Sequence, residues 1–367
     1  MINKIDYFKI LDTYDKTVSK RVKNKKSLVK MEMNKISYIS NIYNLLINDR
    51  YSFYKYNVFM IKEHKYRIIM SSNIYDKVIN HYFTNYFLYK KLEPYLDKRN
   101  IATRCNMETD YGIRFLKHYY ELYKKYDTFY ILKLDIKKYF YSIDHNVLKA
   151  MLIDKLDNYE YKIICNIIDS TNDSYVNEEI RKIKEKYNNK EVDNIPYYLY
   201  DKGLAIGLMT NQTLAIFYLY KLHNFINKKL KLKHFISYMD DIIIIHRDRE
   251  YLKYSLSEIE EFLKSTLRLQ LNKNKTKIVR CDEWVEFLGY NFKVDNKKTI
   301  VRVRGKSLRR IKNNIKKTKY LYDNNMISFE KCFCVINNYK YSYKYDRSRK
   351  VNNLINKYWR VLNKIIG

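Results

Sequence analysis

The hydrophobic positions of the chain follow two different spacings along its length. Apolar side chains recur at helical spacing in four long segments, residues 73–92, 111–126, 208–229 and 249–267. Short runs rich in aromatic and β-branched residues predict strands at 59–61, 66–69 and 129–134. Between residues 234 and 247, two apolar arms flank a polar turn, which predicts a β-hairpin. Helices packed on one face of an antiparallel sheet make an α+β fold.

The remaining segments have weaker patterns. Residues 1–60 are basic and mainly helical in pattern, whereas residues 171–195 are polar with little periodicity, so we expect an exposed excursion there. Residues 297–320 contain eleven Lys or Arg and no acid. We expect that segment to be a basic helix that includes Arg302 and Arg304, followed by helices with aromatic faces.

The charge of the chain points to a polyanionic partner. Its 367 residues include 72 Lys plus Arg and 40 Asp plus Glu, a net charge of +32. Such an excess is typical of proteins that bind nucleic acid or an anionic membrane surface. AT-rich codons explain part of the Lys and Tyr content, but they explain the net charge less well because Asp and Glu codons are not GC-rich either. We therefore favour nucleic acid.

Targeting signals and cysteine spacing add little. No apolar run approaches the roughly 18 residues of a membrane span, and the first residues lack the apolar stretch of a signal peptide. The five cysteines include no CxxC pair, so a disulfide framework or a zinc ribbon is not expected. We expect a cytoplasmic protein that does not bind membranes.

The predicted hairpin carries the most informative chemistry. Its turn contains Asp240 and Asp241, and adjacent carboxylates between apolar strands repel each other unless a cation balances them. Mg²⁺ prefers such hard oxygen ligands. A solvated turn that happens to contain two Asp residues explains the four residues Tyr238-Met239-Asp240-Asp241 equally well.

A second apolar strand changes that balance, because it ends at Asp135 about a hundred residues earlier. Three carboxylates at strand ends of one sheet can hold two Mg²⁺ ions roughly 4 Å apart, one to activate a 3′-hydroxyl and one to neutralise a triphosphate. The alternative for Asp135 alone is a helix N-cap after a strand. Because Asp135 occurs together with the Asp240–Asp241 pair, the N-cap alternative is weak.

At this point the sequence resembles bacterial reverse transcriptases of the non-LTR type, which include group II intron, diversity-generating and defence-associated enzymes. Residues 129–145 resemble the first palm motif, and residues 235–245 resemble the third. The other matches are 203–212 with the second motif, 271–277 and 287–290 with the fourth motif and the primer grip, and 65–69 with the basic strand of the fingers. The ordered match covers roughly 65–292.

The resemblance implies a right-hand polymerase fold. It divides the chain into a basic helical extension (1–60), fingers (61–128), a palm (129–295, with 171–200 as an excursion toward the fingers) and a helical thumb (296–367). It implies two Mg²⁺ ions, with Mn²⁺ as a possible substitute, near Asp135, Ile136, Asp240 and Asp241. It makes Asp135, Asp240 and Asp241 catalytic, together with Lys275 as a proton donor to pyrophosphate.

The same resemblance assigns nucleotide-binding residues. Lys65 and Arg67 share one face of a strand and can reach a triphosphate. Phe140 stands where a bulky side chain blocks a ribose 2′-hydroxyl, which favours deoxynucleotides, and Gln212 lies near the base or sugar. Each of these residues has a plainer alternative. Lys65 and Arg67 could belong to an exposed basic strand, and Phe140 could be a core residue. Gln212 could cap a helix, and Lys275 could be a solvated side chain in a basic loop.

Further residues are expected to contact template or primer, namely Arg104, Gly207, Tyr238, Leu288, Gly289, Arg309 and Arg310. Some positions depart from the family pattern. Ala205 replaces the usual Pro, and Asn211 replaces the Ser of the diversity-generating branch. Residues 106–108 replace a Gly- and Lys-containing segment, which puts the template role of that segment in doubt.

The sequence therefore predicts an RNA-directed DNA polymerase with an RNA template, a DNA or RNA primer and dNTPs, resembling stand-alone defence enzymes that work with a dedicated noncoding RNA. A diversity-generating enzyme is the nearest alternative, and untemplated or protein-primed synthesis on the same fold is another. A non-catalytic RNA-binding protein with a relic palm is disfavoured by the three intact carboxylates.

Overall fold

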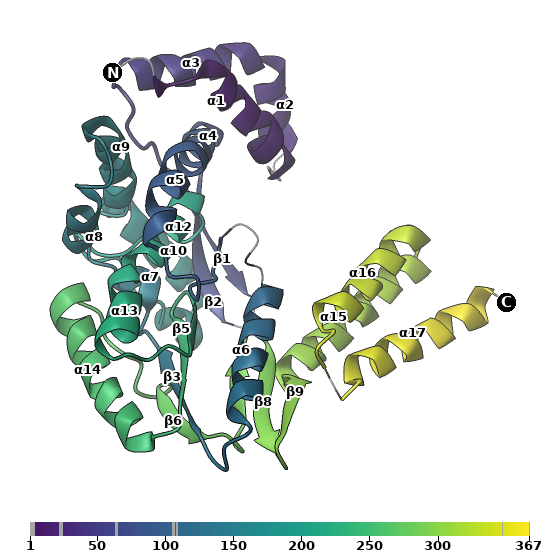
Figure 1. The fold of residues 1–367 in the computed structure, drawn as a ribbon. Helices are drawn as coiled ribbons and strands as arrows, with labels where there is room; N and C mark the ends of the chain where they lie inside the picture. Colours follow the sequence, from purple (N-terminus) through teal and green to yellow (C-terminus); the bar gives the residue numbers. More distant parts are fainter. Residues whose placement is uncertain are drawn as a thin grey trace. The chain divides into compact units, whose positions relative to one another are not determined.

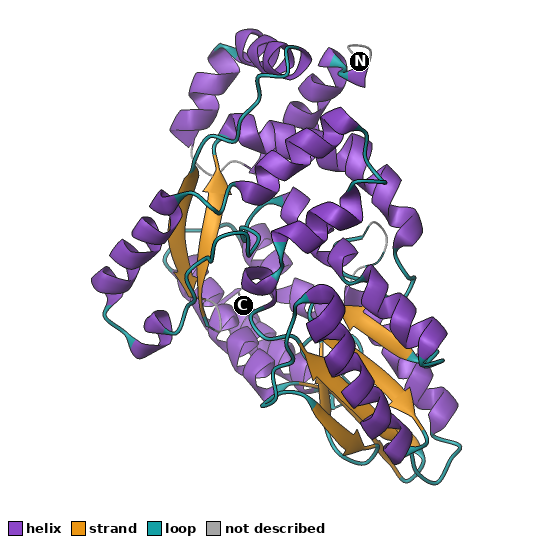
Figure 2. Ribbon diagram, turned by 90° about the vertical axis from the view of Figure 1, so that its left-hand side faces the viewer, coloured by secondary structure: helices purple, strands orange, loops and turns teal. Residues whose placement is uncertain are grey.

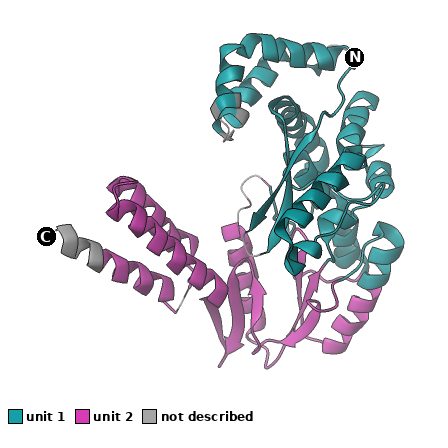
Figure 3. Ribbon diagram, turned by 180° about the vertical axis from the view of Figure 1, so that it is seen from behind, with its two compact units in different colours: residues 1–103, 136–229, 259–271 teal, residues 104–135, 230–258, 272–367 magenta. Residues whose placement is uncertain are grey.

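The structure is a computed structural model that describes residues 4–21, 25–62, 65–104, 107, 109–346 and 348–366. The chain forms two compact units (Figure 3). Unit 1 contains residues 1–103, 136–229 and 259–271, and unit 2 contains residues 104–135, 230–258 and 272–367. Within the described ranges, no helix is both long and apolar enough to cross a membrane.

Unit 1 begins with a helical N-terminal part and a hairpin (Figure 1). The helices are α1 (Tyr7–Thr13), α2 (Lys25–Met33) and α3 (Lys35–Ile47). The hairpin pairs β1 (Tyr56–Lys62) with β2 (Tyr66–Ser72) in antiparallel register. Ile68 and Met70 of β2 are buried while Arg67 is exposed, so the basic side chain lies on the outer face. Lys65, which we expected on this strand, lies one residue before it.

The rest of unit 1 is helical, and capping residues fix where several helices begin. Asn73 caps α4 (Ile74–Phe83), Asp144 caps α8 (His145–Leu152), and Asp157 with Glu160 forms a capping box on α9 (Asn158–Asp169). The other helices of this part are α5 (Tyr89–Leu92), α7 (Tyr139–Ser142) and α12 (Met209–Tyr218). Their apolar faces form one core.

In unit 1, the structure adds detail to one sequence expectation and corrects another. The polar segment 171–195, expected to be an exposed excursion, contains α10 (Ser174–Tyr187) and α11 (Lys190–Asp193). Only Val176 and Ile180 of α10 are buried, so the rest of that helix is at least partly exposed. The segment 208–229 is not one helix, because α12 ends near Leu219 and is followed by α13 (Tyr220–Asn224) and a π-helical turn (Phe225–Lys229).

Unit 2 is built on a four-stranded antiparallel sheet in the order β4-β5-β3-β6. Its strands are β3 (Tyr130–Asp135), β4 (Phe235–Tyr238), β5 (Asp241–His246) and β6 (Lys277–Arg280). Residues 242–245 are all isoleucines and all buried, so the sheet is covered on both faces. Helix α6 (Thr109–Tyr123) contacts β4, and α14 (Arg249–Leu267), of which residues 249–258 belong to unit 2, follows β5. Figure 2 distinguishes helices and strands by colour. The predicted hairpin and the α+β class are confirmed.

A second sheet and three helices complete unit 2. The sheet has the order β7-β8-β9, with β7 (Val285–Phe287), β8 (Tyr290–Asp295) and β9 (Lys298–Val303). The helices are α15 (Gly305–Asp323), α16 (Phe329–Ser342) and α17 (Lys350–Ile366). Arg302 lies in β9 and Arg304 is the N-cap of α15, so neither belongs to the basic helix as expected. Trp359 packs against Phe329 and Phe333.

Candidate catalytic centre

Strand pairing brings two of the predicted carboxylates face to face. Asp135, the last residue of β3, is the direct partner of Asp241, the first residue of β5. Directly opposed residues of an antiparallel pair project their side chains to the same face, with Cβ atoms about 4.5–5.5 Å apart. Both residues belong to unit 2.

The third carboxylate lies in the adjoining turn. Tyr238 of β4 pairs with Asp241, so only Met239 and Asp240 connect the two strands. Met239 has φ 53°, a left-handed conformation that costs a residue with a side chain about 1–2 kcal/mol. The surrounding strand pairs impose this conformation, and it fixes where Asp240 leaves the turn. The three predicted carboxylates therefore gather at one edge of the sheet.

The electrostatics of this edge leave room for a cation. Burial raises the pKa of Asp241 to about 6; Lys133 acts against that rise, whereas Asp240 and Asp135 add to it. In the described part of the chain, the buried Oδ1 atom of Asp241 meets hydrogen-bond geometry with no donor and contacts Lys133 Nζ as an ion pair at 3.2 Å. Three crowded carboxylates fit a hard divalent ion such as Mg²⁺. Asp135, Asp240 and Asp241 are the side chains that would hold it.

Lys133 is a part of the site that the sequence analysis missed. It precedes Asp135 by two residues on β3 and so shares its face of the sheet. Its Nζ atom lies 3.2 Å from the Asp241 carboxylate and donates a hydrogen bond of 2.6 Å to the Glu286 carbonyl. A lysine in an otherwise apolar strand, two positions before an acidic residue, was the available signal.

The segment after residue 271 holds Asp135 in place. Asn272 donates from Nδ2 to Oδ1 of Asp135 at 2.9 Å, and its backbone N–H donates to the Asp135 carbonyl at 2.7 Å. Lys275 donates from Nζ to Oδ2 of Asp135 at 2.5 Å. About half of the Lys275 side chain is exposed, so the ammonium group is accessible at the edge of the site. The sequence analysis missed Asn272 because its role depends on a contact with the distant Asp135 and not on a local pattern.

The predicted nucleotide-side residues belong to unit 1, where Ile136 also lies. Phe140 is half-buried in α7, and its ring contacts Tyr139 edge-on. Gln212 lies in the first turn of α12 and lines a pocket of about 410 Å³. Arg67 is exposed on β2. The structure places these side chains on separate elements of unit 1 and leaves their predicted roles untested.

Gly207 has a backbone requirement that only glycine satisfies. Its φ is 135°, and a Cβ atom there would lie 2.7 Å from the Met70 carbonyl oxygen. The loop that contains it hydrogen-bonds to β2, because Met70 N–H donates to the Ile206 carbonyl at 2.8 Å. Gly207 lines both the 410 Å³ pocket and a second pocket of about 770 Å³, which Lys55 and Lys77 also line.

The residues predicted to contact template or primer lie in unit 2, apart from Gly207. Leu288 and Gly289 form the two-residue turn between β7 and β8, with φ of 47° and 83°. Arg309 and Arg310 are exposed on α15, while Arg104 is half-buried before α6. Arg309 and Arg310 give α15 exposed positive charge, which does not itself identify a ligand.

The chain is similar to two known proteins over about half of its length. The chain is 28% identical over 213 residues to the putative COX1/OXI3 intron 2 protein of Saccharomyces cerevisiae, covering 47% of this chain and 24% of that protein. It is also 28% identical over 178 residues to a RING finger protein of Plasmodium falciparum, covering 48% of this chain and 12% of that protein. The chain thus spans a quarter or less of these relatives.

One solved structure is also similar. Apo telomerase from Candida tropicalis, truncated from its C-terminal domain, aligns with a TM-score of 0.47 at 14% identity, over 69% of this chain and 55% of that chain. The family comparison is the decisive one. A family model described as reverse transcriptase (RNA-dependent DNA polymerase) matches residues 60–292, which is more than half of the chain. The chain therefore belongs to the reverse transcriptase family, in agreement with the right-hand polymerase fold that its sequence predicted.

Proposed function

We propose that the protein is an RNA-directed DNA polymerase that adds dNTPs to the 3′-hydroxyl of a primer. The observation that carries the proposal is the pairing of Asp135 with Asp241 beside the Asp240 turn, within a chain of the reverse transcriptase family. The net charge of +32 supports a nucleic-acid substrate.

The residues of this edge have distinct roles in the proposal. Asp135, Asp240 and Asp241 hold two Mg²⁺ ions, which when bound lower the pKa of the primer hydroxyl and neutralise charge on the triphosphate. Asn272 orients the Asp135 carboxylate through its hydrogen bond to Oδ1. Lys133 keeps one positive charge beside Asp241. Lys275, half-exposed beside Asp135, donates a proton to the departing pyrophosphate.

Substrate selection is assigned to unit 1. Phe140 excludes the ribose 2′-hydroxyl, Gln212 contacts the incoming nucleotide, and Lys65 and Arg67 bind its triphosphate. The 410 Å³ pocket beside Gln212 and the exposure of Arg67 support these assignments. Gly207 allows a nucleic-acid strand to approach the backbone.

The biological role is proposed from the order of the motifs. The ordered motifs from 65 to 292 support an enzyme of the bacterial non-LTR type, for which the proposed role is anti-phage defence in the cytoplasm with a dedicated noncoding RNA. A diversity-generating enzyme is less favoured because Asn211 replaces the Ser of that branch. Untemplated or protein-primed synthesis is the remaining alternative, and the chain's 41 tyrosines leave self-priming open.

The test is a primer-extension assay with a defined RNA template, each set of dNTPs or NTPs, and Mg²⁺. DNA complementary to the template is expected, and Phe140→Ala is expected to increase ribonucleotide incorporation while Phe129→Leu, a buried core change, leaves the sugar preference unaltered. Product that does not follow the template would favour untemplated synthesis. Product that is covalently attached to the protein would favour protein-primed synthesis. Sequencing RNA that co-purifies with the protein identifies its natural template.

A further inference from the structure

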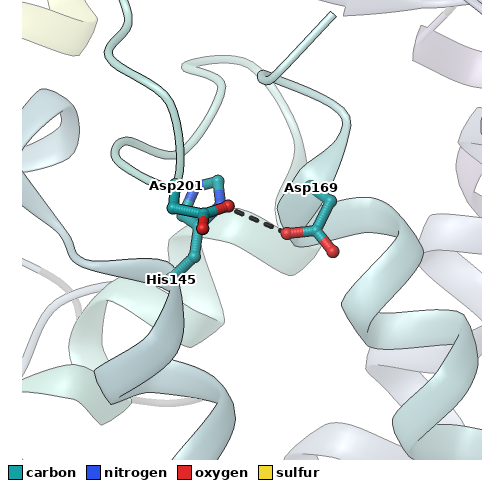
Figure 4. A group of neighbouring side chains, drawn as sticks. All are labelled: His145, Asp169 and Asp201. Carbon is teal, nitrogen blue, oxygen red and sulfur yellow. Dashed lines mark ion pairs between the residues drawn. The ribbon is translucent and has the colours of Figure 1, made fainter.

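A second group of metal-ligating side chains lies in unit 1, among residues with no role in the proposed polymerase chemistry. His145 is the first residue of α8, Asp169 is the last residue of α9, and Asp201 lies in the loop before Gly203 (Figure 4). One ligand atom from each residue lies within 4.8 Å of the other two. His145 is fully buried, whereas the two carboxylates are partly exposed and give solvent access to the group.

The hydrogen bonding of His145 determines which of its nitrogens faces the carboxylates. Nε2 lies 2.8 Å from the Gly203 carbonyl oxygen, which can only accept a hydrogen bond, so Nε2 carries a proton. In the neutral ring, Nδ1 then carries a lone pair. His145 Nδ1 and Asp169 Oδ1 are both buried and lie 3.3 Å apart, and neither meets hydrogen-bond geometry with a partner in the described chain. Lys149 Nζ lies 2.6 Å from the same Oδ1 atom, but the Nδ1 lone pair still faces a carboxylate oxygen.

A cation between these atoms removes the conflict. Two ligands each about 2.05 Å from a tetrahedral Zn²⁺ ion lie about 3.35 Å apart. The 3.3 Å separation of Nδ1 and Oδ1 leaves room for such an ion, and it is longer than the about 2.7–2.9 Å of a charge-assisted hydrogen bond between a histidinium and a carboxylate.

Neighbouring groups orient the ligands as they do around metal centres. Lys149 Nζ lies 2.6 Å from the Asp169 carboxylate, and Asn172 Nδ2 donates to Oδ1 of Asp201 at 2.9 Å. Asn172 also accepts from the Asp201 backbone N–H at 2.9 Å. Lys149 neutralises one carboxylate, so the cluster retains one uncompensated negative charge for a cation.

We propose that His145 Nδ1, Asp169 and Asp201 form a binding site for a Zn²⁺ ion or a similar first-row divalent metal. The imidazole ligand favours Zn²⁺ over Mg²⁺, which prefers oxygen-only sites. The ion joins α8 and α9 to the loop that leads to Gly207. The Gly203 carbonyl of that loop accepts hydrogen bonds from both His145 and Thr171, so His145 links the proposed site to the loop directly.

The test uses full-length protein in which Asp135, Asp240 and Asp241 are each changed to Asn, because this removes the carboxylates of the catalytic edge. After dialysis against a chelator, the protein is titrated with Zn²⁺ and separately with Mg²⁺, and bound metal is counted by elemental analysis. One Zn²⁺ per chain is expected, with a higher melting temperature, and Mg²⁺ is not expected to compete at equal concentration.

Two ligand variants and one control identify the site. Asp169→Asn and Asp201→Asn are each expected to weaken Zn²⁺ binding at least about tenfold. Asp173→Asn, which changes a nearby exposed carboxylate, should leave binding unchanged. Co²⁺ substitution should give the visible spectrum of a tetrahedral nitrogen and oxygen site without thiolate absorption. Absence of stoichiometric binding, or binding that both ligand variants retain, would overturn the proposal and assign the cluster to a histidinium–carboxylate pair.

Discussion

Removal of the Lys133 ammonium group is the perturbation that tests the electrostatics of the catalytic edge. Lys133→Met keeps most of the side-chain length on β3 but takes away the positive charge 3.2 Å from the Asp241 carboxylate. It also removes the hydrogen bond to the Glu286 carbonyl. Only 13% of the Lys133 side chain is exposed, so water replaces the lost partner poorly.

The size of the effect depends on pH because Asp241 can take up a proton. Its pKa, raised to about 6 by burial, rises further without Lys133. The variant can therefore keep Asp241 protonated at pH 7, which is one pH unit above the wild-type pKa of about 6. This protonation lowers the stability of the variant by about 1.4 kcal/mol relative to the wild type. Each further pH unit adds about 1.4 kcal/mol, up to the roughly 3–5 kcal/mol typical of a broken buried ion pair. Stability of the variant is thus lost as pH rises.

The measurement is chemical denaturation of both proteins at pH 7 and pH 8.5, in chelator and in Mg²⁺. In chelator we expect Lys133→Met to lose about 1–2 kcal/mol at pH 7 and about 3 kcal/mol at pH 8.5. Bound Mg²⁺ supplies positive charge at the carboxylates, so the loss should shrink when the metal is added. Lys298→Met, an exposed strand lysine in the same unit, is the control. A loss that depends on neither pH nor Mg²⁺ would refute this reasoning.

Three other predictions follow from the described contacts. Burial raises the pKa of Asp76 to about 6, so the free energy of unfolding of the wild type, relative to Asp76→Asn, should fall by about 3 kcal/mol between pH 4 and pH 7; an equal pH dependence in both proteins would contradict it. Gly207→Ala places Cβ 2.7 Å from the Met70 carbonyl and should cost at least about 1–3 kcal/mol and lower synthesis, whereas a stable, active variant would show that the loop can adjust. Changing Arg309 and Arg310 to Gln should flatten the slope of log K for duplex binding against log salt by about 1.8, and an unchanged slope would remove both residues from the interface.

The parts of the structure that the sequence predicts best depend on local pattern. The hairpin from 234 to 247 has two short apolar arms around a polar turn, and the structure contains β4 and β5 there. Asp135 ends an apolar run, so its place at a strand end follows from the same pattern. Their pairing as direct neighbours depends on register, which is a tertiary property.

Other parts depend on contacts between distant residues and leave no local pattern. Lys133 joins the site through a strand register, and Asn272 joins it through a contact with Asp135, 137 residues earlier in the chain. His145 reads as an ordinary helix residue until its buried nitrogen is seen opposite Asp169.

The central claim is that Asp135, Asp240 and Asp241 catalyse DNA synthesis on an RNA template. The most direct measurement compares wild-type protein, Asp240→Asn and Asp127→Asn in extension of a DNA primer on a defined RNA, with RNA binding measured in parallel. Asp127 is a fully exposed carboxylate outside the site and serves as the control. We predict template-complementary DNA from the wild type and the control, and a loss of at least about a thousandfold in Asp240→Asn with RNA binding retained. Equal synthesis by Asp240→Asn and the wild type would contradict the account.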